Sequence, residues 1–106
     1  MNKSYLSYTA AVILQTLDNG YQYGFDIMDV TGLPSGTVYP ALRRLEENSY
    51  VKGQWERQAI AQKEQRPPRK YYELTKAGKA LLAEAVARYR LLEQSPLATP
   101  QPKEAN

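Results

Sequence analysis

Residues 33–47 constrain the fold more than any other part of the chain, because they follow a tight turn with a short amphipathic helix. At about 100° of rotation per residue, Val38, Leu42 and Leu45 fall on one side of this helix. The opposite side carries small, polar and basic residues. The stretch therefore predicts a helix at about 36–48 that buries one face and presents the other to a partner.

The turn at 31–34 joins this helix to a shorter predicted helix at about 23–30. Its glycine permits the bend, and its proline keeps the preceding residue extended. Ser35 is a suitable N-cap for the later helix, and Pro40 is tolerated only near the first turn. Two short helices joined by such a turn, after a longer helix at about 4–17, indicate a helix-turn-helix arrangement.

The periodicity changes from helical to alternating after residue 50, which predicts strands at 51–56 and 69–74. The segment 58–68 between them is polar and basic, and its two consecutive prolines oppose regular structure. We therefore expect a β-hairpin, or wing, with a long flexible tip. We expect Trp55, the single tryptophan, to anchor the hairpin to the helical core.

A fourth helix is predicted at about 76–93, with Thr75 as its cap. Its apolar side is not needed by a three-helix core and would be exposed in a single chain, so burial against a second copy is the simplest account. A pocket between the subunits is the alternative use of these side chains. The predicted dimer contacts are Leu81, Leu82, Ala85, Val86, Tyr89 and Leu92.

The chain contains neither cysteine nor histidine. Disulfides and thiolate sites are therefore excluded, and the commonest general base and metal ligand are missing. We expect no enzyme, no metal and no cofactor. The sequence also has no run of about 18 apolar residues and no secretory signal, so we expect a soluble cytoplasmic protein without a membrane partner.

Positive charge is concentrated in the predicted hairpin and the start of the helix after it. Residues 52–79 carry eight Lys and Arg against three Glu, a balance of +5, whereas residues 1–50 have a balance of −2. A local basic block favours an anionic partner that touches one place. A solvated, charge-rich loop is the alternative.

The exposed face of the helix at 36–48 has the features of a surface that reads DNA. Its small residues at the N-terminal end allow close approach to base edges, and Arg43 can make a bidentate contact to guanine or phosphate. Tyr39 either contacts a phosphate or packs against the preceding helix, and the basic hairpin suits the DNA backbone or minor groove. The residues predicted to contact DNA on these grounds are Gly36, Thr37, Tyr39, Pro40, Arg43, Arg44, Lys63, Arg66, Arg69 and Lys70.

Three stretches also carry motifs of a known kind, namely 24–28, 33–46 (LPSGTVYPALRRLE) and 69–78 (RKYYELTKAG). Together they resemble the PadR family of bacterial transcriptional regulators, over about residues 5–93 and in the short form with one C-terminal helix. The resemblance implies a winged helix-turn-helix dimer that represses promoters and releases DNA on binding a small molecule. It also implies DNA contacts at Ser35, Thr37, Tyr39, Pro40 and Arg43.

From the residues and the resemblance together, we expect a mainly α fold with a small β-hairpin. Residues 1–75 would form a winged helix-turn-helix DNA-binding domain, 76–94 a dimerisation helix and 95–106 a disordered tail. The expected function is a sequence-specific transcription regulator, a homodimeric repressor of a palindromic operator in double-stranded DNA, released by a small hydrophobic or aromatic effector. The alternative is a winged-helix module that uses its wing for protein–protein contact with an acidic partner.

Overall fold

The structure is a computed structural model, and it describes residues 6–94. The predicted tail at 95–106 lies outside the described residues, as do the first residues of the helix expected at 4–17. None of the helices within residues 6–94 is long and apolar enough to cross a membrane.

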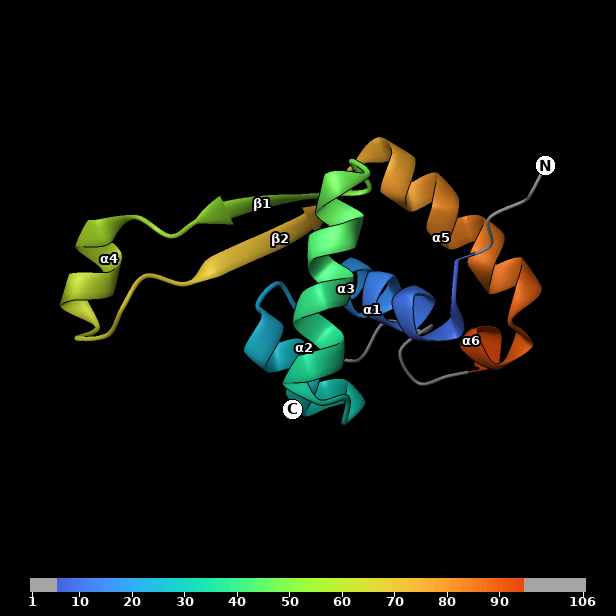
Figure 1. Cartoon of the computed structure of the whole chain (residues 1–106), viewed down its shortest axis with the longest axis horizontal. Coiled ribbons are helices and arrows are strands. Elements are labelled where there is room, and N and C mark those ends of the chain that lie inside the picture. The colour runs from blue at the N-terminus through green and yellow to red at the C-terminus, as the bar shows by residue number, and fades with distance from the viewer. Residues whose placement is uncertain (1–5, 95–106) are drawn as a thin grey trace.

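Three helices form the centre of the fold: α1 (Tyr8–Asp18), α2 (Gly24–Thr31) and α3 (Ser35–Glu47). Their apolar sides meet in one core that contains Leu14, Ile27 and Leu42, all fully buried. Gly32 ends α2 in the left-handed conformation, at φ 78°, which a glycine adopts without steric cost. The predicted helix-turn-helix is confirmed (Figure 1).

The predicted cap of α3 is wrong by one residue. Ser35 lies inside the helix, and Pro34 is the N-cap, with extended backbone and no side-chain hydrogen bond. The backbone carbonyl of Pro34 instead accepts hydrogen bonds from the amides of Thr37, at 2.9 Å, and Val38, at 3.0 Å. The Ser35 side chain is exposed and makes no capping hydrogen bond.

The predicted hairpin is confirmed as two antiparallel strands, β1 (Val51–Trp55) and β2 (Lys70–Leu74), with Gly53 opposite Tyr72. Its tip differs from the expected irregular loop, because Gln58–Lys63 form a short helix, α4. Figure 1 shows the hairpin extending away from the helical body on one side, with α4 at its far end.

The tip is ordered by a charged contact across its base. The guanidinium of Arg66 donates to both carboxylate oxygens of Glu56, at 2.6 and 3.0 Å. The amide of Arg69 donates to the same carboxylate at 3.2 Å, and Ala61 of α4 is buried beneath. The two prolines, at 67 and 68, follow the last residue of α4, Lys63, and therefore do not interrupt the helix.

The helix predicted at 76–93 is two helices, α5 (Lys76–Arg88) and α6 (Arg90–Gln94). Thr75 caps α5 as predicted, its hydroxyl accepting from the amide of Gly78 at 3.0 Å. The break lies at Tyr89, whose backbone is extended. The Tyr89 hydroxyl donates to the carbonyl of Leu6 at 2.7 Å, which holds the chain against the start of α1.

The expectation that the apolar side of this segment is exposed in a single chain is also wrong. Leu82, Ala85 and Leu92 are buried within the chain: Leu82 joins the main core, and the other two pack with Ala11 of α1. Gln15 of α1 donates to the carbonyl of Leu92 at 3.3 Å, which fastens α6 to α1. Leu81, Val86 and Tyr89 are only half-buried.

Candidate nucleic-acid interface

Helix α3 is rolled so that its predicted reading face points outward. Val38, Ala41, Leu42 and Leu45 are buried on its inner side. The predicted contact residues of this helix keep exposed surface. Ser35, Gly36, Tyr39, Arg43 and Arg44 are exposed, and Thr37 and Pro40 are half-buried.

Tyr39 is placed by a glycine on the neighbouring helix. A Cβ atom on Gly24 would lie 2.7 Å from both the Cζ atom and the hydroxyl oxygen of Tyr39, so only glycine lets this ring rest on the start of α2. The Tyr39 side chain is still 42% exposed. The sequence predicts that Tyr39 either contacts a phosphate or packs against the preceding helix. In the structure it packs against α2, and the exposed part of its side chain is still free to contact a partner.

The two arginines of α3 face different flanks of the helix. Arg43 lines a cavity of about 470 Å³ between α2, α3 and the hairpin. Arg44 lines another, of about 370 Å³, together with residues from the start of α1. As consecutive residues of a helix, Arg43 and Arg44 project about 100° apart around the α3 axis.

Two of the four predicted hairpin cations form ion pairs with carboxylates of the same chain. Arg66 pairs with Glu56 at the tip, and hydrogen bonding from Arg66 lowers the pKa of Glu56 from 4.5 to about 2. Lys70 pairs with Glu46 of α3 at 3.0 Å. Lys63 and Arg69 are exposed, and among residues 6–94 neither has an ion-pair partner.

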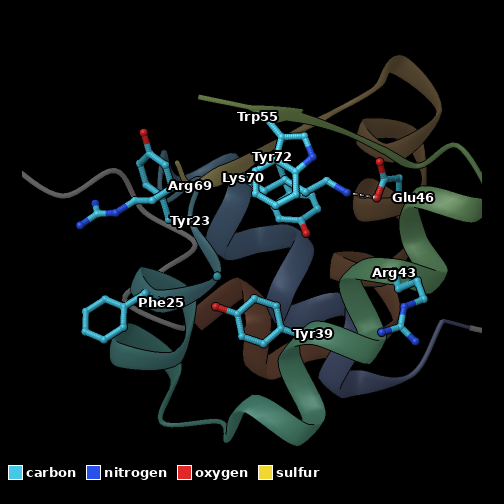
Figure 2. A pocket seen from close by; sticks show the side chains of 10 residues that line it. Tyr23, Phe25, Tyr39, Arg43, Glu46, Trp55, Arg69, Lys70 and Tyr72 are labelled. Carbon is cyan, nitrogen blue, oxygen red and sulfur yellow. Dashed lines mark hydrogen bonds and ion pairs between the residues drawn. The ribbon is translucent and has the colours of Figure 1, made fainter. Parts of the chain in front are cut away.

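The structure brings Arg43, Arg69 and Lys70 together around the 470 Å³ cavity, with Tyr39. Lys63 and Arg66 lie apart from them, in the segment at the hairpin tip. Figure 2 shows the hairpin residues Lys70 and Trp55 on one side of the cavity, and Tyr39 and Arg43 of α3 on the other.

Aromatic residues that were not predicted to belong to a site complete the cavity. They are Tyr23 and Phe25 at the start of α2 and Tyr72 of β2. Burial raises the pKa of the Tyr72 phenol, so the ring is neutral at physiological pH. Each sits within one of the family-like stretches or beside it, but their spacing in the sequence does not reveal that they converge.

Trp55 corrects a further prediction, since it does not anchor the hairpin to the core. Its side chain is 65% exposed, and the ammonium of Lys70 lies 5.8 Å from the centroid of its ring. Trp55 does point to the same side of the strand as Val51, which is buried. The helices that cover Val51 do not extend as far as Trp55. The Trp55 ring therefore lines the cavity instead of packing into the core.

Comparison with known proteins gives a family match. The model of the family described as "Transcriptional regulator PadR-like family" matches residues 13–84. No curated protein matches the chain.

Solved structures of the same family resemble this chain. A PadR-like transcription factor from Bacteroides fragilis is 29% identical, with a TM-score of 0.63, over 81% of this chain and 84% of that one. A PadR family regulator from Clostridium difficile is 27% identical, with a TM-score of 0.68, over 83% of this chain and 93% of that one. A further structure shows likeness of fold alone. It is BpsR of Bordetella bronchiseptica, whose DNA binding is regulated by 6-hydroxynicotinic acid, and it is 22% identical with a TM-score of 0.68 over 99% of this chain and 75% of that one.

Proposed function

The chain belongs to the PadR-like family of transcriptional regulators, and on that premise we propose that it is a homodimeric repressor of a palindromic operator, released by a small molecule. Membership makes it a DNA-binding regulator and not an enzyme. Its place of action in this proposal is the bacterial cytoplasm, where the chromosome is.

The observation that carries the proposal is the outward face of α3. Gly36 has open space around it, so the backbone of α3 can approach base edges closely there. Arg43, about two turns further along the helix, is exposed and offers a planar fork that matches the O6 and N7 atoms of guanine. In this arrangement, α3 enters the major groove, and the hairpin lies along the backbone beside it.

Two-fold symmetry supplies the second half of the contact. A dimer of this kind places one α3 in each of two successive major grooves, about 34–36 Å apart, so the operator repeats as a palindrome. We assign the dimer contact to α5 and α6. Leu81, Val86 and Tyr89 retain surface for it, and Leu91 of α6 is 67% exposed.

The proposed release of DNA on binding a small molecule is based on a protein with the same fold. DNA binding by BpsR is regulated by 6-hydroxynicotinic acid. A ligand that binds the DNA-free form better than the DNA-bound form shifts the population off the operator. We propose a small effector of this general kind here, without carrying over that compound.

Selection of bound duplexes from random oligonucleotides, combined with gel filtration, tests the proposal. The expected result is a dimer that enriches one palindrome at moderate salt. The Arg43→Ala variant is expected to lose enrichment at one base pair of each half-site, and Lys79→Ala, an exposed lysine of α5, serves as the control. A monomer that enriches no sequence contradicts the proposal and favours a protein–protein module.

A further inference from the structure

The helical pattern of the C-terminal segment continues across the point where its helix is broken. The stripe consists of Leu82, Ala85, Tyr89 and Leu92, which follow one another at the three- and four-residue spacing of a single continuous helix. The structure nevertheless breaks the segment at Tyr89, at φ −102° and ψ 93°, before α6 begins. Neither glycine nor proline, which cause most sharp helix breaks, occurs in residues 79–94. The break is therefore imposed by packing and not by the local sequence.

The packing responsible is the return of α6 from the end of α5 toward α1 (Figure 1). Leu92 of α6 is buried in one cluster with Ala11 of α1 and Ala85 of α5, and we call the surface formed by these two alanines the α6-binding surface. In a single chain, a straight helix would lift Leu92 off this surface and expose both to water. Burial of Leu92 therefore holds α6 in the folded-back position when the chain is alone.

The folded-back position leaves polar groups incompletely satisfied. Gln15 of α1 is 4% exposed and donates to the carbonyl of Leu92 at 3.3 Å, but within residues 6–94 its Oε1 atom has no hydrogen-bond partner. The break also removes the backbone hydrogen bonds that would cross Tyr89 in a continuous helix. Leu91, beside Leu92, is 67% exposed. The position thus satisfies the burial of Leu92 at the expense of hydrogen bonding and of a second leucine.

We propose that α5 and α6 join into one straight helix in the dimer, and that α6 of each copy binds the α6-binding surface of the other. In an antiparallel pair of straight helices centred at residues 88–89, Leu92 of one copy lies opposite Ala85 of its partner, because both positions are equally far from that centre. The exchange therefore keeps Leu92 buried and restores the helical hydrogen bonds across Tyr89.

The occupant of the α6-binding surface is thus either the chain's own α6 or that of a second copy. The two arrangements exclude each other at each surface, and the exchanged one is favoured by protein concentration, because two copies must meet. A lone chain covers its own dimerisation surface. This inference deepens the proposed homodimer and rests on it.

Arg90→Pro separates the two arrangements. Arg90 is the exposed first residue of α6, where proline fits a helix, and Tyr89 already has the extended backbone that a following proline requires. In a straight helix the same proline would lie in the interior, where it removes a hydrogen bond and clashes with the preceding turn. We expect a folded monomer, with the dimer dissociation constant raised at least about a hundredfold in analytical ultracentrifugation. Arg90→Ala, which suits both arrangements, is the matched control and should leave that constant within about threefold of its original value.

A disulfide can report which chain supplies α6, because the protein contains no cysteine of its own. Ala11→Cys and Leu92→Cys place thiols in the same buried cluster. The two singly substituted chains are unfolded, mixed, refolded together and oxidised. We expect a disulfide-linked dimer on a non-reducing gel from the mixture, and none from either variant alone. One chain that carries both substitutions together with Arg90→Pro should instead form the disulfide internally and migrate as a monomer.

Different results would overturn the exchange and the proposed homodimer. An unaltered protein that dimerises, with an Arg90→Pro variant that dimerises equally well, overturns the exchange and leaves the homodimer standing. Equal loss of the dimer in Arg90→Ala also overturns it, because the side chain and not the backbone would then be responsible. If Arg90→Pro fails to fold, the cysteine mixture decides, and a dimeric protein without the mixed disulfide contradicts the exchange. An unaltered protein that stays monomeric at every concentration overturns both.

Discussion

The ammonium nitrogen of Lys70 lies 3.0 Å from Oε1 of Glu46 and ties the hairpin to α3 across Gly53. A Cβ atom at Gly53 would lie 2.6 Å from Cε of Lys70 and 2.9 Å from Oε2 of Glu46. The missing side chain of this glycine therefore makes room for the pair. Both charged side chains are about one-third exposed or less, so the contact is partly screened by water.

Gly53→Ala is expected to separate this pair without unfolding the protein. The atoms in the way are the ends of flexible side chains, which can swing aside, and an exposed ion pair contributes less than about 1 kcal/mol. The unfolding free energy, measured by urea denaturation, should change by no more than that. In the parent protein, Glu46→Gln should shift the NMR signals of the Lys70 side chain, because it removes the partner of the pair. In the Gly53→Ala background the same exchange should leave those signals unchanged. A shift that persists in that background would contradict the assigned role of Gly53.

Gly78→Ala should behave differently, because the obstacle there is backbone. A Cβ atom on Gly78 would overlap the carbonyl oxygen of Tyr50, which is held in place by its hydrogen bond from Thr75. Overpacking of this kind costs about 1–3 kcal/mol, more than the gain in helix propensity returns. We expect a clear fall in the thermal midpoint.

Gly36→Ala is the matched control, since it is the same exchange in an α-helix with open space around it. It should raise the unfolding free energy by less than about 1 kcal/mol through helix propensity alone, since Gly36 lies in the first turn of α3. The same variant should weaken operator binding if the α3 backbone approaches base edges at this residue. Equal effects of Gly36→Ala and Gly78→Ala on stability would refute the steric argument.

Arg43→Ala and Lys63→Ala are expected to affect DNA binding in different ways. Loss of a bidentate base contact should cost about 1–3 kcal/mol and flatten the preference at one position. Loss of a phosphate contact should weaken all sequences alike and reduce the salt slope by about 1. Mobility shifts on the selected operator and on a scrambled duplex, at several salt concentrations, distinguish the two outcomes.

The hairpin tip should lose stability in acid. Since the pKa of Glu56 is about 2 in the folded chain against 4.5 for a free carboxyl, its contribution is complete above about 4.5 and is lost as the pH falls toward 2. The protection factors of the amides of residues 58–66, which are corrected for the intrinsic pH dependence of exchange, should fall over that window. Glu56→Gln should give low protection at every pH, and high protection in that variant would show that another contact holds the tip.

The central helices and both strands could be predicted from periodicity because each buries one regular face. Two errors concern how far the core extends. Trp55 alternates correctly with Val51 but extends beyond the helices that would cover it. Conversely, Leu82 of α5 is buried in the main core, and Leu92 is buried with Ala11 of α1 because the chain turns back at Tyr89.

The α4 helix and the aromatic cavity depend on contacts that no local pattern encodes. Glu56 and Arg66 are ten residues apart, and their pairing closes the tip into a helix. Gly24 and Tyr39 belong to different helices, and only their packing shows why the first must be glycine. For the cavity, the missing signal was the pairing register that places Lys70 opposite Trp55.

The ion pairs of the hairpin also predict how the proposed DNA binding depends on each cation. Arg66 and Lys70 each have a carboxylate partner, so each contributes little net field at a distance, whereas Lys63 and Arg69 are exposed and are the hairpin cations expected to attract DNA from a distance. Mutating Lys63 should therefore slow association, most visibly at low salt. If Arg66 and Lys70 exchange their carboxylate partners for phosphates once the proposed complex has formed, their mutation should change the lifetime of the complex more than its rate of formation.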